Sequence, residues 1–406
     1  MTYLTHDIPV AGGLLRVAEW RPDGFAPGDA GRAGYAPGDA GRAGFAAGDA
    51  GRAGFTPGGD EVPLIVALHG MTGSHLSWQH LAAQLPHARI IAPDLRGRGR
   101  SADLPGPYGI AGHVADLLAV VAALRLTPEA SPATLIGHSL GAFVAVAALR
   151  EAPQLFGRAI LADGGLPLTV PLNLRDDDLV EAVMGVAVAR RTELTFTSKQ
   201  IYRKFWRLHP GFAASWSDEL GVMADYDLTE TIAADGSLQY RPVSSREAIE
   251  ADARELYGSH AILAALAAAG AGGGMGAASA GGGMAAAGAG GGMGAAGAGG
   301  DGVAAGAGGG TGAAGANGDS ESPGHPGAGN GTTTSPRPRV TVLTAARGLL
   351  NETPGVYSPR EIAAWQAEFS WVEFVEVPNV NHYSLVLSAR GAKAVAREYN
   401  RTLIPA

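Results

Sequence analysis

The sequence contains no cysteine, which excludes disulfide bonds, cysteine-bound structural zinc and thiol catalysis. It also lacks an excess of positive charge, since 30 Lys and Arg stand against 38 Asp and Glu, for a net charge of −8. An acidic chain of this kind is a poor ligand for nucleic acid or an anionic membrane. We therefore expect a soluble protein with neither as a partner.

Other familiar signals are missing as well. The start, MTYLTHDIPVAGG, has no basic region followed by a continuous apolar run, which predicts no secretory signal and a cytoplasmic location. The sequence has no H-E-x-x-H metal spacing, no glycine-rich phosphate loop and no dinucleotide fingerprint. We expect no metal and no cofactor, and a small molecule as the substrate.

Glycine, in contrast, is abundant at 62 residues, and most of it lies in two tracts. Residues 24–60 repeat a decapeptide of the type GFAPGDAGRA, whose glycine spacing breaks a collagen register, so we expect a flexible loop, with a ligand or partner array as the alternative. Residues 267–335 are rich in Gly and Ala. Their neighbourhood has too few large apolar residues for a membrane span, which predicts a disordered insertion.

The remaining sequence alternates strand and helix signals, which predicts a mostly parallel sheet with helices on both faces. We expect the core in residues 1–165 and 336–406, with a helix-rich segment at 166–266 after the sixth strand. The predicted strands are 13–20 (in a hairpin with the segment at Ile8), 63–68, 89–92, 133–136, 159–162, 340–344 and 371–377. The predicted helices are 74–85, 113–126 and 142–150, one that opens at Ser358-Pro359-Arg360-Glu361, and one after Tyr383.

One pentapeptide carries the strongest chemical signal. Gly137-His138-Ser139-Leu140-Gly141 stands between a short apolar strand and a helix without Pro or Gly. This context for G-x-S-x-G is typical of a nucleophile elbow, where the serine hydroxyl projects at the helix N-terminus. Ser139 is therefore the candidate nucleophile, with a structural turn as the alternative.

Polar motifs follow several predicted strands, at the edge where a parallel sheet binds its ligand. They are H-G-M-T-G from His69, D-L-R-G-R-G-R-S from Asp94, Asp163-Gly164-Gly165, and N-V-N-H from Asn379. In this order the chain resembles the α/β-hydrolase superfamily, in its lid-bearing, epoxide-hydrolase-like or lipase-like branch. The resemblance covers nearly everything outside the two tracts.

The resemblance implies roles for particular residues. His382 occupies the place of the general base, the alternative being a surface or helix-capping histidine. The N–H groups of Met71 and Leu140 would form the oxyanion hole, with His69 shaping that loop. The segment 166–266 would be the lid. Its aromatic residues could line a pocket or form the lid's own core: Phe196, Tyr202, Phe205, Trp206, Phe212, Trp216 and Tyr226.

The acid of the triad departs from the commonest family pattern, which places an Asp near Gly348. Asp163 is the first alternative, because some superfamily members use the end of the preceding strand. Glu352 is the second, and a site without a carboxylate is the third. Asp94 and the arginines after it are interpreted as structural, His138 as pointing away from the nucleophile, and His75, His80 and His87 as ordinary helix or surface residues.

Together these features predict a serine hydrolase that cleaves a small or medium apolar ester through an acyl-enzyme. C–C, thioester or amide hydrolysis and perhydrolysis would use the same site. A hypothesis of another class is a catalytically weak hydrolase-fold protein that binds a ligand under its lid.

Overall fold

The computed structural model describes residues 1–24, 62–123, 133–168, 178–257, 260–271 and 337–403. The predicted low-complexity tracts, 24–60 and 267–335, lie outside these ranges apart from their first residues. The described residues all belong to one compact unit of the chain.

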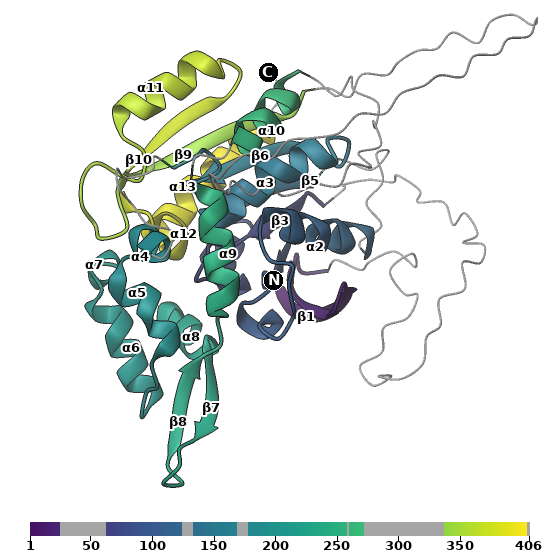
Figure 1. The fold of residues 1–406 in the computed structure, drawn as a ribbon. Coiled ribbons are helices and arrows are strands. Elements are labelled where there is room, and N and C mark those ends of the chain that lie inside the picture. The colour runs from purple at the N-terminus through teal and green to yellow at the C-terminus, as the bar shows by residue number, and fades with distance from the viewer. Residues whose placement is uncertain (25–61, 124–132, 169–177, 258–259, 272–336, 404–406) are drawn as a thin grey trace, which may run out of the picture. The chain divides into compact units, whose positions relative to one another are not determined.

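Eight strands of the described chain form one sheet in the order β1-β2-β4-β3-β5-β6-β9-β10 (Figure 1). They are β1 (Thr2–Val10), β2 (Gly13–Arg21), β3 (Leu64–Leu68), β4 (Arg89–Pro93), β5 (Ala133–His138), β6 (Phe156–Ala162), β9 (Arg339–Arg347) and β10 (Glu373–Asn381). The pairs β1–β2 and β2–β4 are antiparallel, and every pair from β4 to β10 is parallel. The predicted mostly parallel sheet and its first hairpin are confirmed.

Helices cover both faces of the sheet, which explains why the central strands are continuous apolar runs. On one face α2 (Ile110–Ala123), α3 (Leu140–Glu151) and α10 (His260–Gly270) pack side by side. The other face carries α1 (Gln79–Gln84), α12 (Ser384–Leu387) and α13 (Ala389–Leu403). All six residues of β5 between them are buried. Within the described ranges, no helix has the length and apolar character needed to cross a membrane.

Helix starts differ in how visible they are in the sequence. The start of α11 (Pro359–Glu368) follows the predicted capping box, in which Ser358 and Glu361 exchange side-chain and backbone hydrogen bonds. Helix α2, expected from His113, begins already at Ile110. Its first N–H groups are capped by the carboxylates of Asp252 and Glu255, which belong to a distant helix and leave no local pattern.

The segment between β6 and β9 is rich in helix, as predicted. It contains α4 (Leu179–Met184), α5 (Val186–Arg190), α6 (Lys199–Leu208), α7 (Pro210–Ala213), α8 (Asp218–Tyr226) and α9 (Arg246–Leu256). It also contains an unpredicted antiparallel hairpin, β7 (Leu228–Ile232) and β8 (Leu238–Pro242), which extends away from the helices (Figure 1). The Asp235-Gly236 dipeptide between these strands, with Gly236 at φ 83°, is the local signal that predicts such a turn.

The predicted boundary between this segment and the second tract also needs a change. Helix α10 crosses residue 266 and continues to Gly270, because the alanines that follow Leu266 are strong helix formers. The helix packs against α3 on the sheet. The last part of the segment expected at 166–266 is therefore a layer of the core.

A first prediction concerns the contact between α3 and β3. A Cβ atom on Gly141 would lie 2.1 Å from the carbonyl oxygen of Leu68, so Gly141→Ala should lower the free energy of unfolding by about 1–3 kcal/mol or more. Gly221→Ala is the matched control, since its Cβ would meet only Arg203 atoms at 3.8–3.9 Å and alanine favours a helix by about 0.5–1 kcal/mol. Urea unfolding measures both. Equal stability of the two variants would contradict the packing described here.

Candidate active site

Ser139 lies at a sharp turn between β5 and α3, with φ 51° and ψ −121°, in a region that side chains rarely adopt. The turn requires glycine at neighbouring positions, because a side chain there would collide with nearby backbone. A Cβ on Gly164 would lie 2.4 Å from the Ser139 carbonyl oxygen, and one on Gly137 would lie 2.3 Å from that of Gly141. The turn therefore holds the serine at the carboxyl end of the central strand, as the elbow pattern predicts.

His382 and Asp163 meet at the same edge of the sheet. Asp163 follows β6 directly and is 1% exposed; its Oδ2 lies 2.7 Å from His382 Nδ1 and its Oδ1 accepts from the Ala345 N–H at 3.0 Å. The backbone N–H of His382 donates to the Arg347 carbonyl at 3.0 Å. A carboxylate oxygen accepts, so Nδ1 carries the proton and Nε2 is left as the acceptor.

Glu352, the other candidate acid, is placed differently. It is exposed in the loop after β9, where its carbonyl oxygen accepts from the Gly348 N–H at 2.9 Å. Within the described part of the chain, His382 is hydrogen-bonded to Asp163 and has no such bond to Glu352. The structure thus brings together Ser139, His382 and Asp163 around the end of β5 and leaves Glu352 outside this group.

The loop after β3 packs against the serine. The Gly73 N–H donates to the Gly70 carbonyl at 3.0 Å and closes a turn with Met71 at its second position. A Cβ on Gly70 would lie 3.1 Å from that of Ser139, so the loop and the elbow are in contact. Among the hydrogen bonds of the described residues, the N–H groups of Met71 and Leu140 have no acceptor.

His69 holds this loop, as expected. Its Nδ1 lies 2.7 Å from the Gly70 carbonyl oxygen, and its Nε2 accepts from the Leu95 N–H at 2.9 Å. Complete burial lowers the pKa of His69 to about 4, so the ring is neutral near pH 7. A neutral ring with its proton on Nδ1 satisfies both contacts.

His138 corrects one expectation, because its ring does not point away from the site. It lies against the His382 ring, with 4.7 Å between centroids, and its Nε2 is 2.9 Å from the His382 carbonyl oxygen. A carbonyl only accepts, so Nε2 carries the proton, and burial lowers the pKa of His138 well below its usual value. His138 therefore supports the backbone of His382.

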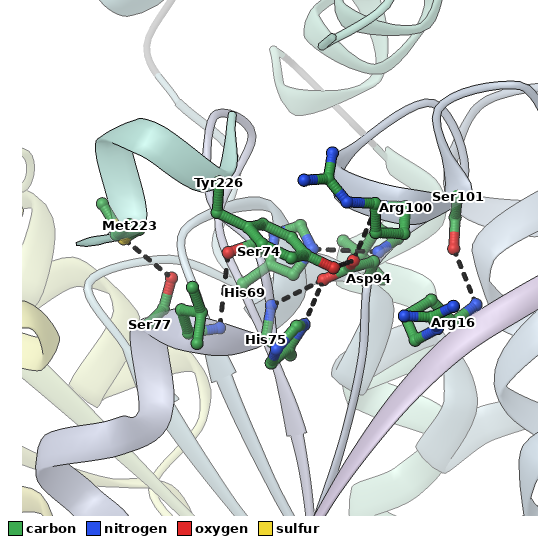
Figure 2. Close-up of polar contacts among 12 residues, drawn as sticks. Arg16, His69, Ser74, His75, Ser77, Asp94, Arg100, Ser101, Met223 and Tyr226 are labelled. Atoms are coloured by element: carbon green, nitrogen blue, oxygen red, sulfur yellow. Dashed lines mark hydrogen bonds and ion pairs between the residues drawn. The ribbon is translucent and has the colours of Figure 1, made fainter. Parts of the chain in front are cut away.

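Figure 2 shows a second buried centre, around Asp94. The Asp94 carboxylate accepts from the His75 backbone N–H (2.8 Å), His75 Nδ1 (2.7 Å), the Arg100 N–H (2.8 Å) and the Tyr226 hydroxyl (2.8 Å). Burial opposes the charge, but the hydrogen bonds and charge of His75 outweigh it and lower the pKa of Asp94. The structural interpretation of Asp94 agrees with these contacts.

His75 is accordingly not an ordinary helix residue. It is fully buried, and its Nε2 lies 2.7 Å from the Tyr3 hydroxyl. The 3-10 helix that it opens (His75–Trp78) is held against Asp94, and through Tyr226 the same carboxylate contacts α8. No pattern in the sequence links His75 to Asp94, since the pairing arises from adjacent strand ends.

A cavity opens over Ser139 and His382, with about 860 Å³ of space between the lining atoms, part of which is open to solvent. Its walls come from the loop after β3, from α6 to α8 and from the residues around His382. The aromatic residues of the inserted segment divide into two sets. Trp206, Phe212, Trp216 and Tyr226 line the cavity, whereas Phe196, Tyr202 and Phe205 pack on one another at centroid distances of 4.8–6.2 Å.

The described residues contain no cluster of three or more His, Asp or Glu side chains that could hold a metal ion. The polar residues that line the cavity include Ser139, His138 and His382, and the nearby N–H groups of Met71 and Leu140 have no acceptor among the hydrogen bonds of the described residues. This set can deliver a nucleophile, move a proton and stabilise a developing oxyanion.

Comparisons with known proteins agree with this arrangement at the level of the fold. The family described as the alpha/beta hydrolase fold matches residues 63–185. Lipase LipV of Mycobacterium tuberculosis is 34% identical over 104 residues, which cover 26% of this chain and 38% of that protein. A 2-succinyl-6-hydroxy-2,4-cyclohexadiene-1-carboxylate synthase of Salmonella paratyphi C is 33% identical over 112 residues, 27% of this chain and 42% of that protein. The matched stretch thus covers less than half of either relative.

Among solved structures, E-2-(acetamidomethylene)succinate hydrolase superimposes with a TM-score of 0.57 and 16% sequence identity. The match covers 98% of this chain and all of the other. At this identity the similarity concerns the fold alone.

A second prediction follows from the burial of His69. Its pKa is about 4 in the folded state and about 6.5 when unfolded, so the unfolded chain binds the extra proton between these values. The contribution of neutral His69 to the free energy of unfolding is complete above pH 6.5. It falls by about 3 kcal/mol in total as the pH drops toward 4. Urea unfolding at several pH values should show that His69→Gln is less stable than the wild type at pH 7. Its stability should also fall less than that of the wild type between pH 6.5 and pH 4. A variant with the wild-type pH dependence would contradict the assignment.

Proposed function

Because the chain belongs to the α/β-hydrolase superfamily, we propose that it is a serine hydrolase that cleaves a small or medium apolar carboxylic ester through an acyl-enzyme. The observation that carries this proposal is the 2.7 Å hydrogen bond between buried Asp163 and His382, in a cavity that Ser139 also lines. An oriented histidine beside a serine on a strained turn is the arrangement that generates an alkoxide-like nucleophile.

In the acylation step Ser139 Oγ attacks the carbonyl carbon of the ester while His382 Nε2 takes the hydroxyl proton. The carbonyl oxygen becomes an oxyanion, which accepts from the N–H groups of Met71 and Leu140. The tetrahedral intermediate collapses, the bond to the alcohol breaks, and His382 returns the proton to the departing oxygen. Asp163 keeps the imidazole oriented and stabilises its positive charge.

In the deacylation step a water molecule replaces the alcohol. His382 Nε2 takes a proton from this water, whose oxygen attacks the acyl carbon. The same two N–H groups stabilise the second oxyanion. Collapse of this intermediate releases the carboxylic acid and restores the proton to Ser139 Oγ.

The cavity walls support an apolar substrate. Apart from the polar groups at the floor, most of the lining is large and apolar, contributed by Met184, Trp206, Phe212, Trp216, Leu220, Met223, Leu349, Tyr383 and Leu387. Because α6, α7 and α8 supply much of this surface, we propose that they act as the lid. The relative LipV is named as a lipase, which is in keeping with ester cleavage.

The third prediction tests the nucleophile. A fluorophosphonate probe should label the wild-type protein, and Ser139→Ala should remove both the labelling and all ester hydrolysis above the rate of the uncatalysed reaction. Nitrophenyl esters of rising chain length, compared with a thioester and an amide, measure the bond preference. Equal labelling of the wild type and Ser139→Ala, or no turnover of any of these substrates, would refute the proposed function.

The fourth prediction separates the two candidate acids. Asp163→Asn keeps the size of the side chain but loses the charge that orients His382, so kcat should fall by roughly 10³–10⁴-fold. Glu352→Gln is the matched control and should stay within about twofold of the wild type, since Glu352 has no hydrogen bond to His382 in the described chain. The assignment fails if Asp163→Asn retains wild-type turnover, or if Glu352→Gln shows the larger loss.

A further inference from the structure

Arg98 is a completely buried arginine beside the loop that carries Met71. Its Nε donates to the Met71 carbonyl at 3.1 Å, and one terminal nitrogen donates to the Arg96 carbonyl at 2.9 Å. The other terminal nitrogen forms an ion pair with Asp252 Oδ2 at 2.5 Å. Two hydrogen bonds and one ion pair, to three segments, thus hold the planar guanidinium in one orientation.

Asp252 anchors this arginine to the inserted segment. It is fully buried on α9, and its carboxylate also accepts from the Gly109 N–H at 2.9 Å and lies 3.1 Å from His113 Nε2. Burial opposes its ionisation, but the charges of Arg98 and His113 outweigh this and lower the pKa of Asp252. The carboxylate is therefore ionised near pH 7 and balances the buried arginine.

The geometry of the peptide group connects these contacts to the oxyanion. In a trans peptide the C=O and N–H point in opposite directions, so the bonds that hold the Gly70 carbonyl also aim the Met71 N–H. His69 and the Gly73 N–H hold that carbonyl. The next peptide, 71–72, is held by Arg98 through the Met71 carbonyl. Met71 is therefore fixed on both sides, and rotation about either of its backbone bonds would break one of these contacts.

We propose that Arg98 is a positioning residue for the hydrolysis. By holding the 71–72 peptide it fixes the backbone of Met71, so that the Met71 N–H meets the oxyanion. Through Asp252 it also ties this loop to α9. The role rests on the proposed function, because it assigns the Met71 N–H as an oxyanion donor. The inserted segment, which lines the cavity and contains α9, would thereby also help to position the Met71 N–H.

The test compares Arg98→Lys with Arg96→Lys. A lysine at 98 keeps the charge but cannot reach two carbonyls and a carboxylate in one plane, so kcat should fall about 10–100-fold with KM changed less than about threefold. Loss of a whole oxyanion donor costs about 10²–10³-fold. The inhibition constant of an aromatic boronic acid, whose tetrahedral adduct places an oxygen in the oxyanion hole, should rise by the same factor. Arg96 is a matched control in the same loop: it is 3% exposed and paired with Asp116, and its substitution should lower Tm but leave kcat within about threefold.

A double-mutant cycle separates positioning from general stability. Met71→Pro removes the N–H at a turn position that accepts proline, and should lower kcat about 10²–10³-fold, while Met71→Leu keeps the N–H as its control. If Arg98 acts through this N–H, Arg98→Lys should change kcat less than about twofold in the Met71→Pro background. Additive losses would overturn the proposal, as would an Arg98→Lys variant that matches Arg96→Lys in kcat and boronic acid affinity.

If Arg98→Lys does not fold, Asp252→Asn replaces it in the same cycle. This variant removes the charge that holds the guanidinium, so a smaller loss of kcat that also vanishes with Met71→Pro is expected. An additive loss would again overturn the role of Arg98. Failure of the proposed function is a separate result, because it would appear in the wild type as absence of both ester turnover and fluorophosphonate labelling.

Discussion

The close approach of backbone segments around Ser139 is the constraint on which the rest of the structure depends. Cβ atoms on Gly137, Gly141 and Gly164 would all lie within 2.4 Å of a backbone oxygen, so β5, α3 and the loops after β3 and β6 can come together only without side chains at these positions. Ser139 has its positive φ of 51° within this crowded region. Among the glycines that the structure describes, these three lie where the backbone around Ser139 is most crowded.

Buried carboxylate–histidine pairs recur among the residues that the structure describes, and only one of these pairs faces the cavity at Ser139. Asp94 pairs with His75, Asp252 with His113, and Asp163 with His382. In the first pair the far nitrogen of the histidine is hydrogen-bonded to the Tyr3 hydroxyl, so it does not face a substrate as a general base must. In the third, His382 and Ser139 line one cavity. The group that lies beside the histidine, and not the ion pair itself, therefore distinguishes a candidate catalytic pair from a structural one.

Much of the fold could be predicted from the sequence because its signals are local. Apolar runs predict the parallel strands, and the strand–G-x-S-x-G–helix context predicts the turn at Ser139. The acid was ambiguous because its partner depends on strand order: β6 lies beside β9, which puts Asp163 next to Ala345 and under His382. The same limit explains the errors at His75 and His138, whose partners are distant in sequence.

The inserted segment illustrates why such residues escape sequence patterns. In the sequence it resembles a lid inserted after the sixth strand, yet α9 supplies carboxylates that cap α2 and that pair with buried Arg98. Tyr226, at the end of α8, binds Asp94 beneath the loop after β4. A buried charge is tolerated only when it is paired, so the core arginine and the segment's carboxylate must be retained together. Sequence changes in the segment that alter the cavity can therefore also disturb the loop that carries Met71, so the shape of the cavity and the position of this loop are physically linked in this fold.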